Sequence, residues 1–322
     1  PMTDTVRWGV LGAAKIARTA LCPAIHLARD GVLAALATRS AGKAAPFTRR
    51  YPGLRVHETY DALLADPEID AVYIPLPNEQ HVDWTLRALD AGKHVLCEKP
   101  IALASGEIDR LVARRDATGL LAAEAFMVVH HPQWVRVRQL LAEGAIGRLA
   151  EVQGVFTYYN DDMGNIRQHA AHGGGGLRDV GVYPMVTTRF ATGAEPDAVT
   201  ARLTRENGVD VYARVWADFP GFALSFYCGM RMLRRQEMVF HGTEGWIRLQ
   251  APFNPNIYAD GRLEWRRPDG VEEVETYTGI DQYVLQVEAF NDSVLTGAPF
   301  ACPLEFSRGN QAAIDAVFSA AE

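Results

Sequence analysis

The sequence predicts a protein of the α/β class, in which a doubly wound parallel sheet is followed by a second domain rich in antiparallel strands. Three observations lead to this prediction. Short apolar segments alternate with amphipathic ones over residues 6–124, as strands and helices do in a parallel sheet. A turn of small residues follows the first apolar segment. Residues 211–249 instead alternate apolar and polar side chains with the period of two that antiparallel strands show.

The length and composition of the chain agree with two soluble globular domains. Its 322 residues are enough for two domains of ordinary size, which we place at residues 1–125 and 126–322. The formal charge of −7 argues against a nucleic-acid surface, since such a surface needs clustered Lys and Arg. No apolar run approaches the roughly 18 residues that span a bilayer. We therefore expect neither a nucleic acid nor a membrane as a partner.

The four cysteines, at positions 22, 97, 228 and 302, are far apart and form no Cys-x-x-Cys pair. They are expected to be reduced, buried thiols of a cytoplasmic protein. The first residues lead directly into a strand pattern and offer no signal peptide. Neither a disulfide framework nor a structural zinc site is expected.

The first strand and the turn after it form a candidate phosphate-binding loop. A strand is predicted over 6–11 and a helix over 15–29. The turn reads Gly12-Ala13-Ala14-Lys15-Ile16-Ala17. It matches the Gly-x-Gly-x-x-Gly loop with alanine at the second and third glycine positions, and the start of the helix offers N–H groups to anionic oxygens. A second strand over 32–37 completes a βαβ unit, which strengthens a motif that is weak alone.

The residues after the second strand favour NADP over NAD. An NAD site normally has Asp or Glu there, bonded to the ribose 2′-hydroxyl. This chain has Thr38, Arg39 and Ser40, with Lys43 close behind. Hydroxyls and cations in place of a carboxylate suit the 2′-phosphate of NADP. A solvated polar turn with no role in cofactor choice is the alternative.

The strand predicted over 94–97 ends abruptly in polar residues. Glu98, Lys99 and Pro100 follow it directly. A carboxylate, an ammonium and a rigid imide do not continue a core, but they hold a lysine at the carboxyl edge of a sheet, where ligands bind in open α/β folds. We expect Glu98 and Lys99 at the cofactor edge. A surface-exposed strand end with a Glu–Lys pair is the alternative.

A third strand, over 71–74, is predicted to end at the same edge. It breaks at Leu76, Pro77 and Asn78, and His81 falls in the first turn of the next helix. We expect these residues to border the cofactor, although a histidine in this place is more often a cap or solvated. The other predicted elements of the domain are helices over 60–64, 80–91 and 105–118 and a strand over 120–124.

The second domain begins with a helix within 128–143 and a half-buried strand over 151–159. A polar loop over 161–176, with four consecutive glycines, follows. Long loops without structure of their own are often functional. His169 and His172 have the spacing of a metal pair, but no third ligand accompanies them, and we expect no metal.

Four further strands are expected to form an antiparallel meander, because turn residues separate them. They cover 211–216, 222–227, 237–241 and 246–249. Helices over 281–296 and 307–321 are predicted to close the chain. The aromatic residues that alternate along these strands form either a core under a helix or a dimer face.

The helix predicted over 179–191 carries a candidate catalytic pair. Asp179 and Tyr183 are four residues apart, so both project from one face. An Asp that stabilises the helix dipole and a Tyr that packs on its neighbours is the structural alternative. The lysine and the glycine turn upstream make the functional interpretation stronger.

Several segments, in order, resemble the glucose–fructose oxidoreductase / inositol dehydrogenase (Gfo/Idh/MocA) superfamily. They are residues 8–17 (Trp-Gly-Val-Leu-Gly-Ala-Ala-Lys-Ile-Ala), 77–81 (Pro-Asn-Glu-Gln-His) and 92–100 (Gly-Lys-His-Val-Leu-Cys-Glu-Lys-Pro). Residues 124–127 (Glu-Ala-Phe-Met) and 130–133 (His-His-Pro-Gln) are similar to its dihydrodiol dehydrogenase and NADP-linked aldose (xylose) dehydrogenase branch. The resemblance extends from residue 6 to about residue 190.

The resemblance implies an N-terminal Rossmann domain and a C-terminal α/β domain with a large, mostly antiparallel sheet that often forms dimers. It implies that Lys99 is catalytic, that its bond to Pro100 is frequently cis, and that Asp179 and Tyr183 lie beside the nicotinamide. Arg167 is the corresponding nicotinamide-side arginine. Its neighbour Ile166 replaces the Trp of many relatives, as alanines replace glycines in the phosphate loop.

The resulting hypothesis is an NADP-dependent dehydrogenase of an aldose or a cyclic diol, acting as a homodimer or a dimer of dimers. Tyr183 would be the general base, Lys99 would lower its pKa and bind the substrate oxygen, and Asp179 would orient Lys99 or a substrate hydroxyl. Phe156 and Tyr283 are expected on the substrate side. An oxidoreductase that holds NADP tightly and exchanges hydride between two sugars, and a non-catalytic NADP or sugar sensor, are the alternatives.

Overall fold

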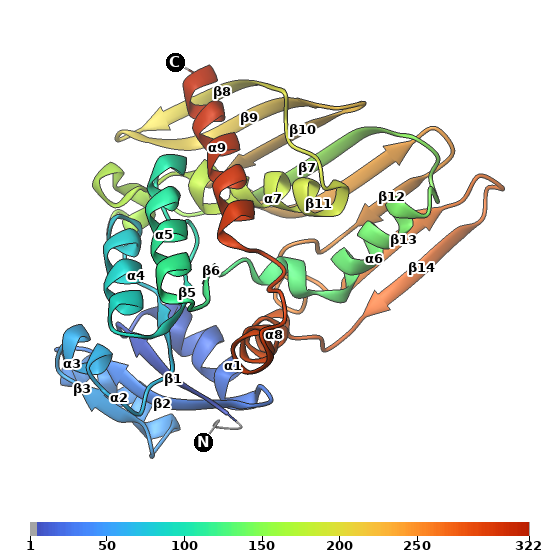
Figure 1. Ribbon diagram of the computed structural model, residues 1–322. Coiled ribbons are helices and arrows are strands. Elements are labelled where there is room, and N and C mark those ends of the chain that lie inside the picture. The colour runs from blue at the N-terminus through green and yellow to red at the C-terminus, as the bar shows by residue number, and fades with distance from the viewer. Residues whose placement is uncertain (1–4, 322) are drawn as a thin grey trace. The chain divides into compact units, whose positions relative to one another are not determined.

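The computed structural model describes residues 5–321, and the chain divides into two compact units (Figure 1). The first unit comprises the chain through Met127 together with Gln282–Arg308, and the second comprises Val128–Asp281 and the chain from Gly309 onward. Residues 282–308, which the predicted boundary at residue 125 places in the second domain, fall in the first of these compact units. One long-range contact of this segment is the hydrogen bond that the indole N–H of Trp8 donates to Asn291 Oδ1 at 2.9 Å.

The first unit contains a six-stranded parallel sheet in the order β3-β2-β1-β4-β5-β6. The strands are β1 (Val6–Leu11), β2 (Gly31–Ala37), β3 (Arg55–His57), β4 (Ala71–Ile74), β5 (His94–Cys97) and β6 (Ala122–Glu124). The chain builds outward from β1 through β2 to β3, and then restarts on the other side of β1 with β4. The predicted doubly wound sheet is therefore confirmed, and its strand order reverses between β1 and β4, where such folds bind ligands.

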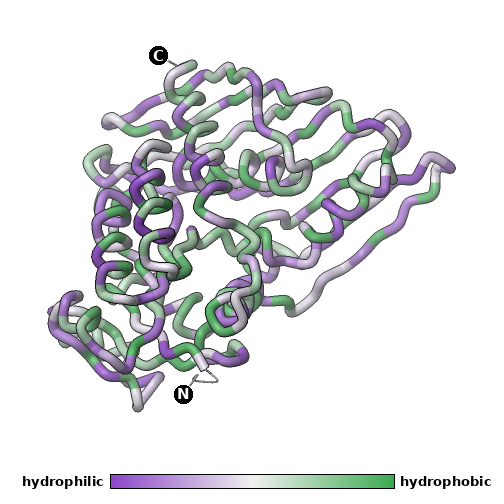
Figure 2. Tube along the Cα trace, viewed as in Figure 1, coloured by the Kyte–Doolittle hydropathy of each residue, from purple (hydrophilic) through white to green (hydrophobic). Residues whose placement is uncertain are grey.

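Helices connect these strands. They are a π-helical turn (Ala17–Leu21), α1 (Cys22–Leu27), α2 (Ala41–Arg50), α3 (Tyr60–Leu64), a 3₁₀ turn (Asn78–Gln80), α4 (His81–Asp90) and α5 (Ser105–Thr118). A further helix of this unit, α8 (Gln282–Thr296), comes from the end of the chain and connects none of these strands. Figure 2 shows hydrophobic and hydrophilic residues alternating along α4 and α5, as in helices with one buried face. Two elements were not predicted: α2, which has a proline inside it, and β3, which is short and mostly exposed.

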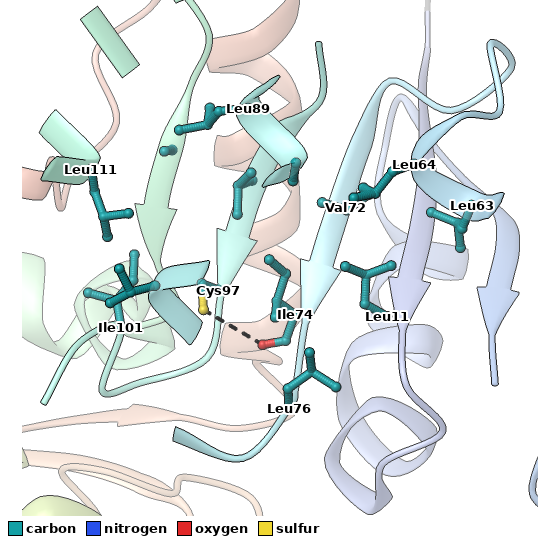
Figure 3. Close-up of a cluster of buried hydrophobic side chains, with 14 of the residues drawn as sticks. Leu11, Leu63, Leu64, Val72, Ile74, Leu76, Leu89, Cys97, Ile101 and Leu111 are labelled. Atoms are coloured by element: carbon teal, nitrogen blue, oxygen red, sulfur yellow. Dashed lines mark hydrogen bonds between the residues drawn. The ribbon is translucent and has the colours of Figure 1, made fainter. Parts of the chain in front are cut away.

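The core of the first unit lies between this sheet and its helices. Figure 3 shows Leu11, Val72 and Ile74 of adjacent strands packed with leucines of the helices. The Cys97 thiol lies 3.8 Å from the carbonyl oxygen of Ile74. All four cysteines are free and buried, as predicted. This core fixes where each strand ends, and so positions the turns that follow the strands.

The second unit contains an eight-stranded sheet in the order β14-β13-β12-β11-β7-β10-β9-β8. The strands are β7 (Leu149–Tyr159), β8 (Ala198–Glu206), β9 (Val209–Phe219), β10 (Phe222–Gly229), β11 (Arg231–Gly242), β12 (Trp246–Leu249), β13 (Gly261–Arg266) and β14 (Glu272–Tyr277). Neighbouring strands are antiparallel except β7 and β10, which are parallel, so the mostly antiparallel sheet is confirmed.

The expected simple meander is wrong at one place, because β7 lies between β10 and β11 and pairs with both. Local alternation identifies strands but does not reveal that an earlier strand separates two later neighbours. The helical segments of this part of the chain are 3₁₀ turns (Met127–His130, Ile166–Gln168, Ala170–His172), α6 (Pro132–Ala142), a π-helical turn (Leu177–Gly181), α7 (Val182–Thr192) and α9 (Leu304–Ala320), whose first turn belongs to the first unit. Within residues 5–321, no helix has the length and apolar character needed to cross a bilayer.

Candidate functional site

The turn after β1 has the geometry of a phosphate-binding loop. Gly12 has φ +106°, and its N–H donates to the Ala37 carbonyl at 3.0 Å. The positive φ favours glycine, and a Cβ at this position would also lie only 3.1 Å from Leu76 Cδ2, a tight contact. Ala17 is fully buried against the sheet, which explains a small residue at the third glycine position. Leu76 follows β4, so the turns after β1 and β4 lie side by side.

The other loop residues form the start of the helical segment. Ala13, Ala14 and Ile16 are half-buried and Lys15 is exposed. The Ala14 carbonyl accepts the Arg18 N–H at 3.1 Å, which is the first helical bond. Small side chains leave the backbone of the loop accessible, as a pyrophosphate requires.

The polar turn after β2 is ordered by its own hydroxyls. Thr38 Oγ1 accepts the Ser40 N–H at 3.3 Å, and Ser40 caps α2 by accepting the Lys43 N–H at 3.3 Å. Arg39 and Lys43 are exposed. Helix capping thus explains Ser40 on structural grounds, whereas the two cations and the absence of a carboxylate at this strand end fit a 2′-phosphate.

His81 joins two turns of the sheet edge. It is fully buried at the start of α4, with Nδ1 2.7 Å from the Pro100 carbonyl oxygen and Nε2 2.8 Å from the Leu76 carbonyl oxygen. Burial lowers its pKa, although the two carbonyls and the Glu98 charge favour the protonated ring. The predicted cofactor-edge histidine therefore contacts the backbone of the turns after β4 and β5, which include Pro77 and Asn78.

The turn that carries Lys99 follows β5 and has a cis bond between Lys99 and Pro100, as the resemblance implied. Glu98 accepts a hydrogen bond from the Tyr73 hydroxyl at 2.6 Å. Burial, with the Glu98 charge second, raises the pKa of Tyr73 well above its usual value. The Ile101 N–H donates to Glu124 Oε1 at 2.9 Å. Buried side chains from β4 and β6 thus hold the turn on both sides of Lys99.

Tyr73 and Glu124 were missed as site residues by the sequence analysis. Glu124 is a carboxylate at the end of a buried strand, which is the signal that identified Glu98, so it could have been found. Tyr73 lies inside an apolar strand, where only its hydroxyl distinguishes it from a core residue. Tyr283, expected on the substrate side, is half-buried in the same unit, and its hydroxyl adds to the rise in the Tyr73 pKa.

In the second unit, Asp179 lies in the π-helical turn and Tyr183 in the first turn of α7, so the predicted helix begins two residues earlier than expected. Asp179 Oδ2 accepts a hydrogen bond from the Tyr158 hydroxyl at 2.5 Å and pairs with Arg167 Nε at 2.8 Å. This ion pair, the largest cause, raises the pKa of Arg167 above its usual value. Burial, with Asp179 second, raises the pKa of Tyr158.

Tyr183 lies in an aromatic cluster and is 5% exposed. Its ring centroid is 5.5 Å from that of Phe156 and 5.6 Å from that of Phe253, and these two phenylalanines stack at 5.0 Å. Arg167 is close enough to interact electrostatically with Tyr183. The structure therefore brings together Arg167, Asp179, Tyr183 and the predicted Phe156, and adds Tyr158 and Phe253, which periodicity alone does not single out.

The histidine pair of the polar loop has other contacts. The rings of His169 and His172 lie 6.1 Å apart, and His169 Nε2 is 2.7 Å from the Met163 carbonyl oxygen. Over the described part of the chain, no group of three or more His, Cys, Asp and Glu residues could hold a metal ion.

Two family models match the chain. One, described as an oxidoreductase family with an NAD-binding Rossmann fold, covers residues 6–126. The other, described as the GFO/IDH/MocA C-terminal domain, covers residues 134–248. The resemblance, the fold class and the predicted class of cofactor, a nicotinamide dinucleotide, are thereby confirmed.

Individual relatives are similar over nearly the whole chain. A dTDP-3,4-didehydro-2,6-dideoxy-alpha-D-glucose 3-reductase from Actinomadura kijaniata is 35% identical over 91% of this chain and 89% of the relative. A D-xylose 1-dehydrogenase (NADP(+)) from Haloferax volcanii is 32% identical over 98% and 97%. The crystal structure of a 3-ketoreductase from Actinomadura kijaniata with NADP and TDP-benzene is 33% identical over 99% and 98%, with a TM-score of 0.90. Variants of that ketoreductase with Tyr replaced by Phe, or Lys by Glu, have also been solved with these ligands.

Proposed function

Because the chain belongs to the GFO/IDH/MocA family of NAD(P)-dependent oxidoreductases, we propose that it interconverts a hydroxyl and a carbonyl group on a sugar or a cyclic diol, with NADP as its cofactor. One observation carries the proposal. Lys99 follows β5 at the carboxyl edge of the parallel sheet, and the glycine turn at Gly12 on the same sheet fits a dinucleotide. The backbone of the Lys99 turn, from Lys99 to Ile101, is hydrogen-bonded by the side chains of Glu98, His81 and Glu124. A lysine on a turn held in this way stands at the edge of the parallel sheet where ligands bind in such folds.

In the proposed reaction, Tyr183 takes the proton of the substrate hydroxyl during oxidation and returns it during reduction. The charge of Arg167 favours the phenolate form of Tyr183. Lys99 binds the substrate oxygen and adds positive charge where negative charge develops. The nicotinamide, when bound, accepts or donates the hydride. Asp179 orients Arg167 and Tyr158 and provides an acceptor for a substrate hydroxyl.

The choice of NADP rests on the turn after β2. Arg39 and Lys43 offer exposed cations, and Thr38 stands at the strand end that carries Asp or Glu in NAD sites. The NADP-linked xylose dehydrogenase and the NADP complex of the ketoreductase support this choice.

Two substrate classes are supported. The preferred substrate is an aldose or a cyclic diol, oxidised by NADP, as the xylose dehydrogenase relative suggests. The second is a nucleotide-linked ketosugar, reduced by NADPH, and the relatives named as 3-ketoreductases favour it. Only the second class carries a nucleotide, with its bulk and charge, so a panel that contains both kinds of substrate separates them.

The test measures NADPH formation with aldoses and cyclic diols, and NADPH consumption with a dTDP-linked ketosugar. Turnover with free aldoses or diols supports the first class, and turnover only with the nucleotide-linked sugar supports the second. A signal that needs a second sugar added to cofactor-loaded protein would indicate hydride exchange between sugars. Tyr183→Phe serves as the inactive control, and Tyr159→Phe, on a 63% exposed tyrosine, is the matched active control. Binding of NADP without turnover of any substrate contradicts the proposal and favours a sensor.

We further propose that the protein forms a homodimer through the face of the eight-stranded sheet that carries Arg214, Trp216 and Tyr227, called the open face below. Along β9 the residues alternate buried and exposed, and Trp216 is 44% exposed on the open side. A cavity of about 420 Å³ lies on this face, lined among others by Arg214, Trp216 and Tyr227. Aromatic and arginine side chains around a hollow are typical of protein interfaces.

A further inference from the structure

Glu124 is a buried carboxyl group beside the lysine turn, and the reaction proposed above does not use it. It ends β6 and is 3% exposed. Its Oε1 accepts the backbone N–H of Ile101 at 2.9 Å, two residues after Lys99. β6 pairs with β5 so that Glu124 lies opposite Cys97, the last residue before the turn. The carboxyl group is therefore fixed to the turn by both the sheet and a side-chain contact.

The groups that face Glu124 come from three elements. Lys99 and Glu98 belong to the turn, the thiol of Cys97 to β5, and Ser307 to α9. The Lys99 ammonium is close enough to stabilise the carboxylate electrostatically, and Glu98 opposes it. Two carboxyl groups thus flank one catalytic lysine, but only Glu98 has a hydroxyl partner on β4.

We propose that Glu124 is a positioning residue that acts on Lys99 in two ways: its carboxylate holds the backbone after Pro100 through Ile101, and its negative charge keeps the Lys99 ammonium oriented. This inference rests on the proposed role of Lys99. Hydrogen bonds to a carboxylate are roughly twice as strong as those to a neutral acceptor, so protonation of Glu124 loosens the turn and removes the counter-charge at once. The ionised form is then the active form.

The two forms of Glu124 coexist near neutral pH. Burial, the largest cause, raises its pKa to about 7, while Ser307, the Ile101 N–H and Lys99 lower it. Activity should therefore fall as the pH decreases through about 7, since Glu124 then takes up a proton. Because the proposed reaction also moves a proton at Tyr183, a comparison with a variant that lacks the Glu124 charge is required to separate the two effects.

The experiment compares the pH profiles of kcat/KM for the wild type and Glu124→Gln. The amide can still accept the Ile101 N–H but carries no charge. In Glu124→Gln we expect the fall in kcat/KM near pH 7, called the limb here, to disappear. At every pH the variant should have roughly the kcat/KM that the wild type has at low pH. This value should lie about tenfold below the wild-type maximum, which corresponds to about 1.4 kcal/mol. The matched control is Glu107→Gln, whose carboxylate accepts the Leu103 and Ala104 N–H groups at 3.0 and 3.1 Å on α5. The control should keep the wild-type profile, and an unchanged limb in Glu124→Gln overturns the proposal.

A second measurement covers the case in which Glu124→Gln does not fold. The protonated carboxyl band of the wild type, followed by infrared difference spectroscopy, should disappear with a midpoint near pH 7. In Lys99→Met this midpoint should rise, because the stabilising ammonium is gone; an unchanged midpoint overturns the proposal. Lys99→Met also separates the two hypotheses. Full activity in it refutes the role of Lys99 itself, whereas its loss of activity together with an unchanged limb in Glu124→Gln refutes only the role of Glu124.

Discussion

Charged groups of the candidate site are bound by specific neighbours within their own unit. Glu98 binds the Tyr73 hydroxyl, and Asp179 binds both Arg167 and the Tyr158 hydroxyl. Such contacts fix rotamers before a ligand arrives, which lowers the cost of ordering the site during binding. At the residue scale, the placement of the charged side chains therefore matters more than their number.

Arg39 provides the first test at this scale. Replacing it with alanine removes a cation from the turn after β2, and we expect the KM for NADP to rise about tenfold, since a charged hydrogen bond to a phosphate contributes on the order of 1.5–3 kcal/mol. The KM for NAD should hardly change, because NAD lacks the 2′-phosphate. Arg110→Ala, on an exposed arginine of α5, is the control. Equal effects on both cofactors would contradict the NADP assignment.

Glu124 also predicts a pH dependence of stability. Its pKa is raised from 4.5 to about 7, so the folded protein keeps a proton that the unfolded chain releases. The free energy of unfolding therefore falls as the pH rises from about 4.5 to 7, and this loss is complete above 7. Relative to the wild type, Glu124→Gln should gain up to about 3 kcal/mol between pH 4.5 and 8, measured by denaturant unfolding. A difference that is constant with pH would exclude the raised pKa.

At the scale of elements, the predictions that succeeded had strong local signals. The bounds of β1, β4, β5, β12, α3 and α5 agree with the sequence analysis residue for residue. Apolar runs with abrupt polar ends mark the strands, and α5 ends at Gly119, which has φ +67° and suits a helix end. α2 and β3 lack such signals, and the position of β7 between β10 and β11 depends on long-range pairing that local patterns do not contain.

The turn after β1 is the element whose disruption is most informative. Gly12→Ala places a Cβ against Leu76 in a backbone conformation with φ +106°, and we expect a loss of about 1–3 kcal/mol of stability together with weaker NADP binding. Gly106→Ala is a matched control on α5, because nothing lies within 4 Å of its Cβ position and its φ is helical. That control should be neutral or stabilising by up to about 1 kcal/mol. Cofactor binding by isothermal titration and unfolding midpoints measure both effects, and a neutral Gly12→Ala would contradict the loop assignment.

At the scale of the whole molecule, the sequence predicts the sheet class of both units and the residue types of the site. It does not predict the partners of those residues. Tyr73, Tyr158 and Phe253 come from segments that are remote in the sequence, and each looks locally like an ordinary strand or loop residue. The segment 282–308 likewise joins the first unit through side-chain contacts such as that between Trp8 and Asn291, which no periodicity reveals.

The proposed dimer is a prediction at this scale. Trp216→Glu places a charge on the open face of the eight-stranded sheet, and we expect it to produce a monomer, because an unpaired charge in an interface is strongly unfavourable. Leu27→Glu changes a 68% exposed leucine of α1 in the first unit and should leave the oligomer intact. Light scattering after size exclusion gives the mass of each. A wild-type monomer, or a Trp216→Glu dimer, contradicts the proposed interface.

The central claim is that Lys99 and Tyr183 carry out the chemistry, whereas the affinity for the cofactor comes mainly from the turns after β1 and β2. The most direct measurement is kcat on the best substrate of the panel, together with the Kd for NADPH, for Lys99→Met and Tyr183→Phe. The account predicts that kcat falls by about 10²-fold or more in each variant, as expected for the loss of an acid–base group or of charge stabilisation, while the Kd for NADPH stays within a few-fold of the wild type. Near-wild-type turnover in either variant, with the fold intact, would contradict it.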